Sequence, residues 1–342
     1  MPIGEPHHMP QPPTALHRNR RSWSIGAMLL LLLCISPAAW SCTISPSVTA
    51  TFASASSFAI ASTPQTTSAQ PNAGAVCRGS VLGLAVVSDQ WIRATLSSAN
   101  QGALVNAASG DAISYRIFAL AAANEEIFLN TTYNYFNPVL IDLLGLIGGQ
   151  SVNIPMEFRT LTTANVAAGT YTDTITINWN WRICNVGVLV CLGFRTGSGV
   201  STVSLSMAVT PDCAIQSPDL DFGSAPLVAG FDPVTQTIDI TCTKGSDFSV
   251  GLSDGQQPAA SIRRMENNGN YLEYQLYKGP TGSERWGNTG SERRSSATAD
   301  TNPGTPSGVT GQGFTYRGEI LPGQTTPPSG TYTDVIVVDV IF

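Results

Sequence analysis

The feature that most constrains the fold is a five-residue phrase, Gly-Thr-Tyr-Thr-Asp, that occurs twice. It spans residues 169–173 and again 330–334. Each copy opens a run rich in β-branched residues, at 174–179 and at 335–340; such residues favour a pleated, half-buried strand. A glycine and an aromatic residue before such a run are typical of a turn that leads into a sheet. This long-range self-similarity predicts two related β domains in tandem.

The two copies differ in the sequence on their C-terminal side. After the first copy, the chain passes Cys184 and Cys191 and enters another alternating run at 200–209. After the second copy, the sequence stops at Phe342. The second domain is therefore expected to have one strand fewer than the first.

The strand-like runs predict an all-β protein made of two tandem immunoglobulin-like β-sandwich domains, the second lacking its last strand. The expected domains span 42–210 and 211–342. No segment combines helical periodicity with helix caps. The stretch 279–312 is expected to be a long polar loop, with Arg293 and Arg294 as a solvated patch. The expected strands lie near residues 43–52, 74–78, 91–97, 112–120, 152–159, 171–183, 200–209, 215–222, 235–242, 247–252, 271–277, 313–320 and 331–341.

Residues 1–41 have the pattern of an export signal. A basic region at 18–21 precedes an apolar stretch at 25–35, and Ser41 is a small residue before Cys42. The apolar stretch is too short for a comfortable membrane span. A lipid on Cys42 is the alternative, but Trp40 fits a lipid-attachment signal poorly. We therefore expect an exported chain that begins at Cys42.

Six cysteines remain after the signal is removed. An even number in an exported chain predicts disulfides. The repeat suggests the pairing, because one pair heads each copy and the two remaining cysteines close a short loop. The expected disulfides are Cys42–Cys77, Cys184–Cys191 and Cys213–Cys242.

Charge and histidine content exclude several function classes. The chain has a formal net charge of −6, which disfavours nucleic-acid binding. His7, His8 and His17 all precede the expected cleavage site, so catalysis through a histidine-activated nucleophile is excluded for the mature chain. The cysteine spacings do not fit a zinc site. We expect no enzyme activity, no metal and no cofactor.

Three apolar segments interrupt the first domain, at 79–88, 138–149 and 186–190. Connections in an immunoglobulin-like sandwich alternate between its two ends, so all three are expected at the end away from the second domain. Exposed there, they predict a surface-binding site; buried, they are part of the core. The predicted site consists of Leu82, Leu84, Leu140, Ile141, Leu143, Leu144, Leu146, Val188, Leu189 and Val190.

The sequence also resembles a known family. The second half resembles the spore coat protein U domain, through Leu220-Asp221-Phe222-Gly223, Tyr274-Gln275-Leu276-Tyr277 and the phrase at 330–334. Cys213, Cys242-Thr243 and Trp286-Gly287 also fit that pattern. The first half, with Asn178-Trp179-Asn180-Trp181-Arg182-Ile183-Cys184, looks like the adhesive domain of two-domain tip subunits of Csu-type pili. Archaic chaperone–usher machinery assembles those pili.

The resemblance implies a pilus tip adhesin that attaches cells to surfaces and supports biofilm formation. Its partners would be a periplasmic chaperone, an outer-membrane usher, and the next pilin subunit, which donates a strand to the C-terminal domain. Apolar or host surfaces would be the adhesion targets. The chain would pass through the periplasm to the cell surface and occupy the pilus tip, because a mature chain beginning at Cys42 has no extension to donate. The alternative is a non-tip structural pilin or a secreted coat-like protein of the same family.

Overall fold

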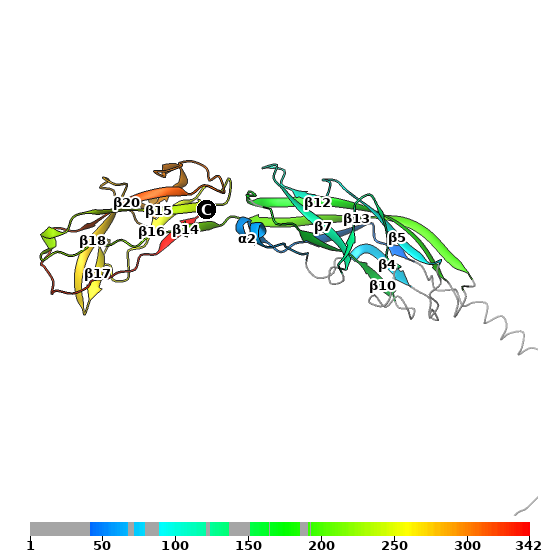
Figure 1. The fold of residues 1–342 in the computed structure, drawn as a ribbon, viewed down its shortest axis with the longest axis horizontal. Helices are drawn as coiled ribbons and strands as arrows, with labels where there is room; N and C mark the ends of the chain where they lie inside the picture. The colour runs from blue at the N-terminus through cyan, green and yellow to red at the C-terminus, as the bar shows by residue number, and fades with distance from the viewer. Residues whose placement is uncertain are drawn as a thin grey trace, which may run out of the picture. The chain divides into compact units, whose positions relative to one another are not determined.

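The computed structural model describes residues 42–67, 72–78, 89–120, 124–136, 151–163, 165–184, 191 and 193–342. The expected export signal lies outside this part of the chain. In the described residues, no helix is long and apolar enough to cross a membrane. The described chain is almost entirely β and forms two sandwiches in tandem, as the alternating runs predicted (Figure 1).

Strand structure is found in every run predicted for the first sandwich, but the runs at 43–52 and 152–159 are each divided into two strands, and several short strands were not predicted. Its elements are β1 (Thr43–Ile44), β2 (Ser47–Thr51), β3 (Ala55–Ser56), α2 (Ser57–Ser62), β4 (Asn72–Arg78), β5 (Trp91–Ser98), β6 (Ala103–Val105), β7 (Ala112–Leu120), β8 (Glu125–Ile127), β9 (Thr132–Asn134), β10 (Ser151–Pro155), β11 (Glu157–Thr160), β12 (Gly169–Cys184) and β13 (Phe194–Thr210).

Strand β12, which begins with the first copy of the phrase, is central to the first sandwich. It pairs antiparallel with β13 along its whole length, from Gly169 opposite Val209 to Cys184 opposite Phe194. Its other edge pairs with β5 and β6. A shorter sheet, in the order β1-β4-β10, completes the sandwich (Figure 1). The first copy therefore has a neighbouring strand on both edges.

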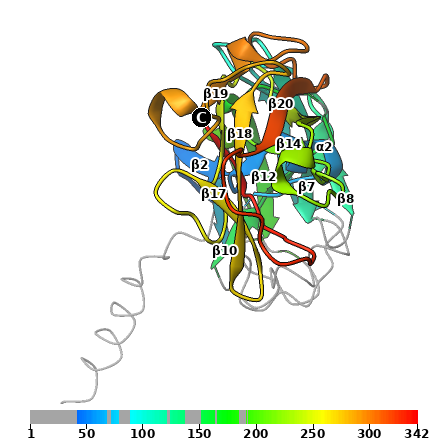
Figure 2. The same ribbon diagram turned by 90° about the vertical axis from the view of Figure 1, so that its left-hand side faces the viewer.

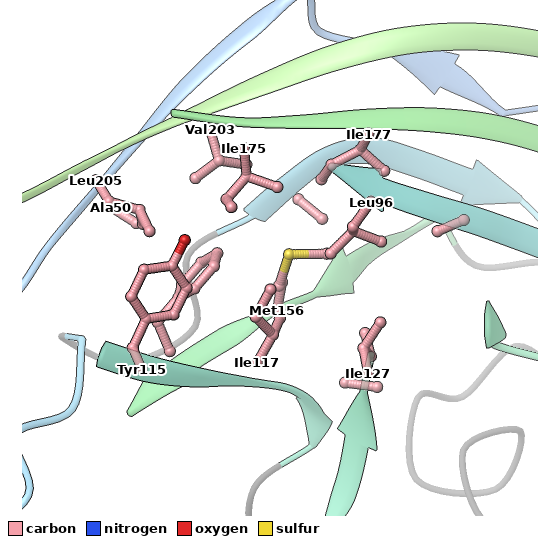
Figure 3. Packing of buried hydrophobic residues seen from close by; sticks show 14 of the residues in the cluster. Ala50, Leu96, Tyr115, Ile117, Ile127, Met156, Ile175, Ile177, Val203 and Leu205 are labelled. Atoms are coloured by element: carbon pink, nitrogen blue, oxygen red, sulfur yellow. The ribbon is translucent and has the colours of Figure 1, made fainter. Parts of the chain in front are cut away.

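The core of the first sandwich is built from the inward positions of these strands. Ile175 and Ile177 of β12 are both fully buried; Figure 3 shows them facing Met156 and Ile117 across the core. Trp179 is also buried, and its indole Nε1 donates a hydrogen bond to the Ser201 hydroxyl at 2.8 Å. Each fully buried aliphatic side chain contributes about 1.5–3 kcal/mol relative to exposure. The inward pattern of β12 therefore anchors this sandwich.

Helix α2 was not predicted, because no segment of the sequence shows helical periodicity. The Ser56 side chain caps it by accepting a hydrogen bond from the Ala59 backbone N–H at 3.2 Å, which satisfies one of the free donors at a helix start. Ile60 buries its side chain completely in the core. A helix of six residues is too short to give a recognisable period, which is why sequence analysis missed it.

The second sandwich is smaller. Its elements are β14 (Cys213–Gln216), η3 (Val228–Gly230), β15 (Val234–Cys242), β16 (Ser249–Leu252), β17 (Arg263–Asn267), β18 (Asn270–Lys278), η4 (Gly290–Glu292), β19 (Arg294–Ser295), η5 (Ser296–Thr298), β20 (Gln312–Ile320) and β21 (Val338–Ile341). One sheet has the order β14-β15-β20-β18-β17, and the other has the order β19-β16-β21. Figure 2 shows the β17–β18 hairpin in yellow and the C-terminal segment in red.

Three expectations for the second sandwich were wrong. The strand expected at 215–222 is β14, which ends at Gln216. The stretch 279–312 is not a continuous loop, because it contains the short elements η4, β19 and η5. The last strand was expected to start at 331, but β21 starts only at Val338. The core is nevertheless well formed around Trp286 and Phe314, which are both fully buried. The Trp286 indole Nε1 donates to the Val250 carbonyl oxygen at 3.2 Å.

The three predicted disulfides are all present, as Cys42–Cys77, Cys184–Cys191 and Cys213–Cys242. The first and third close the longer loops, with sequence separations of 35 and 29. Loops of that length stabilise a fold by roughly 3–4 kcal/mol in the chain-entropy model. The thiol of Cys42 is therefore used in a cross-link rather than free for a lipid.

Candidate functional site

The tyrosine of the repeated phrase makes the same hydrogen bond in both sandwiches. In the first copy, the Tyr171 hydroxyl donates to the Ala167 carbonyl oxygen at 2.7 Å. In the second copy, the Tyr332 hydroxyl donates to the Pro328 carbonyl oxygen at 2.8 Å. In both, the tyrosine bonds to the residue four positions earlier. In the first sandwich this contact lies at the start of β12, whereas in the second it precedes β21 by several residues. This shared contact explains the tyrosine in the phrase.

The aspartate of the phrase also accepts a similar hydrogen bond in both sandwiches. Asp173 accepts a hydrogen bond from the Tyr115 hydroxyl at 2.5 Å, and Asp334 accepts one from the Tyr274 hydroxyl at 2.7 Å. Burial raises the pKa of Tyr115 and of Tyr274, and the carboxylate that each one faces raises it further. Each carboxylate also accepts backbone N–H groups, from Asn100 and Thr174 in the first sandwich and from Gln256 and Val335 in the second. Hydrogen bonds to an ionised acceptor are the stronger kind, so the aspartate locks the strand to a neighbouring loop.

The two copies of the phrase and the runs that follow them differ in how deeply their inward side chains are buried. The inward positions of the first copy are buried, and every matching position of the second is only half-buried. The buried set is Tyr171, Asp173, Ile175, Ile177 and Trp179; the half-buried set is Tyr332, Asp334, Ile336, Val338 and Val340. The alternation is identical, so the difference is not in the sequence pattern. It arises because β13 covers the first copy, whereas no strand of the described second sandwich takes the corresponding place.

Strands β21 and β14 are among the edge strands of the second sandwich. Within the part of the chain that the structure describes, β21 pairs only with β16, and β14 pairs only with β15. Leu220 and Phe222, which come after β14, pack against the core but remain partly exposed. Val335 and Val337 are 57% and 59% exposed. Unpaired edges beside half-covered apolar side chains form a site to which another strand can be added.

Arg293 fastens the C-terminal strand β21 to the sheet. Its guanidinium donates to the Asp339 carboxylate at 2.6 Å, to the Asp339 backbone oxygen at 3.2 Å and to the Ser249 backbone oxygen at 2.8 Å. Its neighbour Arg294 donates to the Asp300 carboxylate at 3.0 Å and lies over the Trp286 ring. Both arginine side chains are at most 9% exposed. The expectation of a solvated arginine patch was therefore wrong, and nothing in the local sequence distinguished these arginines from surface ones.

Arg263 is a further buried cation that sequence analysis missed. Its side chain is fully buried, and its guanidinium donates to the Gln275 amide oxygen at 2.5 Å and to the backbone oxygens of Ser253, Leu252 and Trp286. Burial first, and then the nearby Arg285 charge, lowers the pKa of Arg263 to about 10. The guanidinium satisfies carbonyl groups that the short sheet leaves without partners, as buried polar groups require.

All ten predicted surface-binding residues lie outside the described residues: Leu82, Leu84, Leu140, Ile141, Leu143, Leu144, Leu146, Val188, Leu189 and Val190. The strand ends that flank them are described. The last residue of β4 lies beside the first residue of β10, because Arg78 pairs with Ser151. The last residue of β12 lies beside the first residue of β13, because Cys184 pairs with Phe194. The first residue of β5 also lies beside the end of β12.

These flanking strand ends belong to both sheets and lie at one end of the first sandwich. The Ser201 hydroxyl of β13 donates to the Ala73 carbonyl of β4 at 2.8 Å, and Ile44, which pairs with β4, packs against Gly199. Going along β4 toward Arg78 thus corresponds to going along β13 toward Phe194. We refer to this end as the loop end. Strand β13 runs from the loop end to Thr210, from which the chain enters the second sandwich.

Comparison with known proteins identifies the family. The sequence profile of the spore coat protein U domain matches residues 30–178 and 200–339. The chain belongs to the spore coat protein U domain family. The two matched ranges correspond to the two halves that each carry one copy of the phrase. No curated protein matches the chain in sequence.

Solved structures extend this comparison. The chain is similar to the CsuC–CsuE chaperone–tip adhesion subunit pre-assembly complex from the archaic chaperone–usher Csu pili of Acinetobacter baumannii. The identity is 25%, the match covers 88% of this chain and 100% of that chain, and the TM-score is 0.60. The C-terminal domains of two streptococcal proteins, BspA of Streptococcus agalactiae and AspA of Streptococcus pyogenes, match at 9% identity. These matches cover 87% of this chain and 91% of theirs with TM-scores of 0.19 and 0.21, and they carry no argument.

The family and the first structural match together support a subunit of Csu-type chaperone–usher pili, a class exported to the cell surface. These are structural proteins, and the matches indicate no catalytic family. In the described residues, no group of three or more histidine, cysteine, aspartate or glutamate side chains is placed to hold a metal ion.

Proposed function

We propose that this protein is the tip adhesin of a Csu-type pilus and attaches cells to apolar surfaces, which leads to biofilm formation. A periplasmic chaperone holds the subunit, an outer-membrane usher assembles it, and the next pilin subunit donates a strand to its second sandwich. The ten apolar residues at the loop end form the contact with the surface. The observation that carries the proposal is the two-sandwich match to a tip subunit over the full length of that chain.

The role as strand acceptor is supported by the contrast between the two copies. The first sandwich has β13 beside the first copy, and the second sandwich has open edges at β14 and β21. A donated strand beside β21 gives the second copy what β13 gives the first. It also removes an exposed edge that invites aggregation.

The tip position is supported by the start of the described chain. Cys42 is bonded to Cys77 and is 6% exposed, and β1 already begins at the next residue. Residues from Cys42 onward are therefore committed to the first sandwich. If export removes residues 1–41, no N-terminal extension remains to enter another subunit. N-terminal sequencing of the mature protein tests this point, and an alternating apolar extension before Cys42 identifies a shaft subunit instead.

The adhesive role of the loop end is supported by its chemistry. One apolar side chain buried against a surface contributes about 1.5–3 kcal/mol, before the cost of ordering the loop. Three apolar segments on one subunit, repeated over many pili, add avidity. Attachment without ion pairs is expected to persist in high salt.

Loop-by-loop substitution tests the proposal. Serine replaces Leu82 and Leu84, or Leu143 and Leu144, or Val188 and Leu189, and cell attachment to plastic is measured alongside the number of assembled pili. Lost attachment with normal piliation is the expected result. Val309→Ser in the second sandwich is the matched control, because Val309 is an exposed aliphatic residue, 68% accessible, away from the loop end. Lost piliation identifies the loops as part of the core, and unchanged attachment locates the adhesive surface elsewhere.

A further inference from the structure

The outer face of the first sandwich carries a cluster of aromatic, arginine and asparagine side chains next to the loop end. It is formed on neighbouring strands β5, β12 and β13, and we call it the arginine face. Its members are Trp91, Arg93, Asn178, Asn180, Arg182 and Phe194. The five members on β5 and β12 point away from the core, because they alternate with the buried inward positions of their strands. Phe194 lies on the same face, because the Arg182 guanidinium stacks on its ring. None of them belongs to the apolar segments already considered.

Strand register brings these side chains together. Arg182 lies opposite Trp91, and Asn180 lies opposite Arg93. Side chains directly opposite on a sheet are close neighbours, and diagonal ones are about 7–8 Å apart between Cα atoms. The two arginines are therefore diagonal neighbours on one surface. Sequence analysis did not find this set, because its members lie in three separate parts of the chain.

Both guanidinium groups are held by aromatic rings. The Arg93 Cζ atom lies 4.6 Å from the centre of the Trp91 ring, and the Arg182 Cζ atom lies 3.9 Å from the centre of the Phe194 ring. Stacking of this kind stabilises the planar group and uses its face. Among the described residues, no group accepts a hydrogen bond from the N–H donors of either guanidinium, so these donors are available to a ligand.

Neither arginine has a carboxylate partner among the described residues, whereas Arg285 and Arg293 of the second sandwich are ion-paired. Arg93 is exposed, and Arg182 is partly exposed. Asn178 and Asn180 are exposed, and their amide groups form no hydrogen bond with the described protein. In a chain of net charge −6, this face is a local concentration of positive charge and uncommitted donors.

We propose that the arginine face binds an acidic polysaccharide whose sugar rings carry carboxylate groups. A planar guanidinium binds a carboxylate through two parallel hydrogen bonds. Two such groups on diagonal positions suit a polymer that repeats its carboxylates at short intervals. The asparagine amides between them provide both donors and acceptors, which suit the hydroxyl groups of a sugar.

The charge of the chain argues against nucleic acid as the occupant, because densely charged polyphosphates favour proteins with a large basic surface. Two arginines among neutral amides fit a polymer of lower charge density that also offers hydroxyl groups. The arginine face goes beyond the proposed apolar contact: its binding weakens as salt is added, whereas attachment through the apolar segments persists.

The test uses the mature chain purified from the periplasm and two matched probes, polygalacturonate and its fully methyl-esterified form. The expected result is binding of the acid and not of the neutral ester, with affinity falling as salt rises. Arg93→Gln and Arg182→Gln are each expected to weaken binding by about tenfold or more, since hydrogen bonds to charged groups are among the stronger ones. Equal binding of acid and ester overturns the proposal.

Two further variants keep the test independent of folding. Asn180→Asp changes an exposed side chain with no protein partner among the described residues and places a negative charge opposite Arg93, so it is expected to abolish binding. Arg264→Gln is the matched control, because Arg264 stacks on Tyr271 at 4.2 Å in the second sandwich and lies outside the arginine face. Unchanged binding by the Asn180→Asp protein refutes the site. Dextran sulfate or DNA binding as tightly as polygalacturonate refutes the assignment to a carboxylated sugar polymer. Because none of these measurements involves plastic or pili, the outcome is independent of the proposed apolar adhesion.

Discussion

Completion of the second sandwich by a donated strand predicts a measurable change at one isoleucine. Ile175 in the first copy and Ile336 in the second occupy matching positions, but Ile175 is fully buried and Ile336 is half-buried. Truncating a fully buried isoleucine to alanine costs about 2–5 kcal/mol. An isoleucine that is at most about one-third exposed has up to about one-third of its 1.5–3 kcal/mol burial energy still to gain. In the chain alone, Ile336→Ala is therefore expected to cost up to about 0.5–1 kcal/mol less than truncation of a fully buried isoleucine.

A donor strand is expected to abolish this difference. With the N-terminal extension of a partner pilin fused after Phe342 through a flexible linker, Ile336 becomes covered. Ile336→Ala is then expected to cost about 2–5 kcal/mol, like any buried isoleucine. The cost of Ile175→Ala is expected to stay the same with and without the donor, which makes it the internal control.

Hydrogen exchange followed by mass spectrometry measures both sandwiches in one experiment. Protection of β16 and β21 reports the opening free energy of the second sandwich, and protection of β12 reports that of the first. Fusion of the donor is expected to raise the opening free energy at β16 by several kcal/mol and to leave β12 unchanged. If β16 is equally protected with and without the donor, or if Ile336→Ala costs the same in both proteins, the incomplete-sandwich reasoning is refuted.

Three other outcomes are expected from individual contacts. Tyr115→Phe is expected to cost about 1.5–3 kcal/mol of unfolding free energy, measured by urea denaturation, because Asp173 loses a hydrogen bond to its charged oxygen; a loss below about 0.5 kcal/mol contradicts that role. Arg293→Gln is expected to raise hydrogen exchange in β21 while β12 stays unchanged, and equal protection of β21 rejects the fastening role. Burial alone raises the pKa of Asp300, but hydrogen bonds from Arg294 and from Thr315 outweigh it and lower the pKa below the ordinary 3.8. Its contribution is thus present above about pH 4 and lost as pH falls further, so Asp300→Asn is expected to flatten the acid end of a urea-midpoint profile measured from about pH 7 to about pH 3.

Much of the β framework was predictable, because strands show alternating apolar and polar residues and turn residues separate them. The inward residues of β12, such as Ile175 and Trp179, alternate with polar ones, and the cysteines follow the repeat. What sequence analysis missed depends on tertiary partners. The segment before Val338 has strand composition, but it forms only an isolated bridge, between Thr333 and Glu266 of β17, and no ladder, which shows how far β propensity depends on context. Arg293 is buried because Asp339 and Ser249, distant in sequence, surround it.

The candidate sites also differ in whether they can be seen in the sequence or depend on tertiary partners. The open edge of the second sandwich was predictable, because it follows from counting strands after each copy of the phrase. The arginine face was not, because Trp91, Arg182 and Phe194 become neighbours only through strand register. Register is set by the whole pattern of buried positions and not by any local motif.

The length of β13 has a mechanical consequence for a tip subunit. If the loop end binds the surface as proposed, a held cell pulls between this end, where β13 begins, and the second sandwich, which the chain enters shortly after Thr210. Tension therefore acts along β13, parallel to its 17 residues and across the hydrogen bonds that join it to β12. In this shear geometry all the residue pairs carry the load at once, whereas a force that peels a strand from its end breaks the pairs one after another. The strand that completes the first sandwich would also be its tension-bearing member.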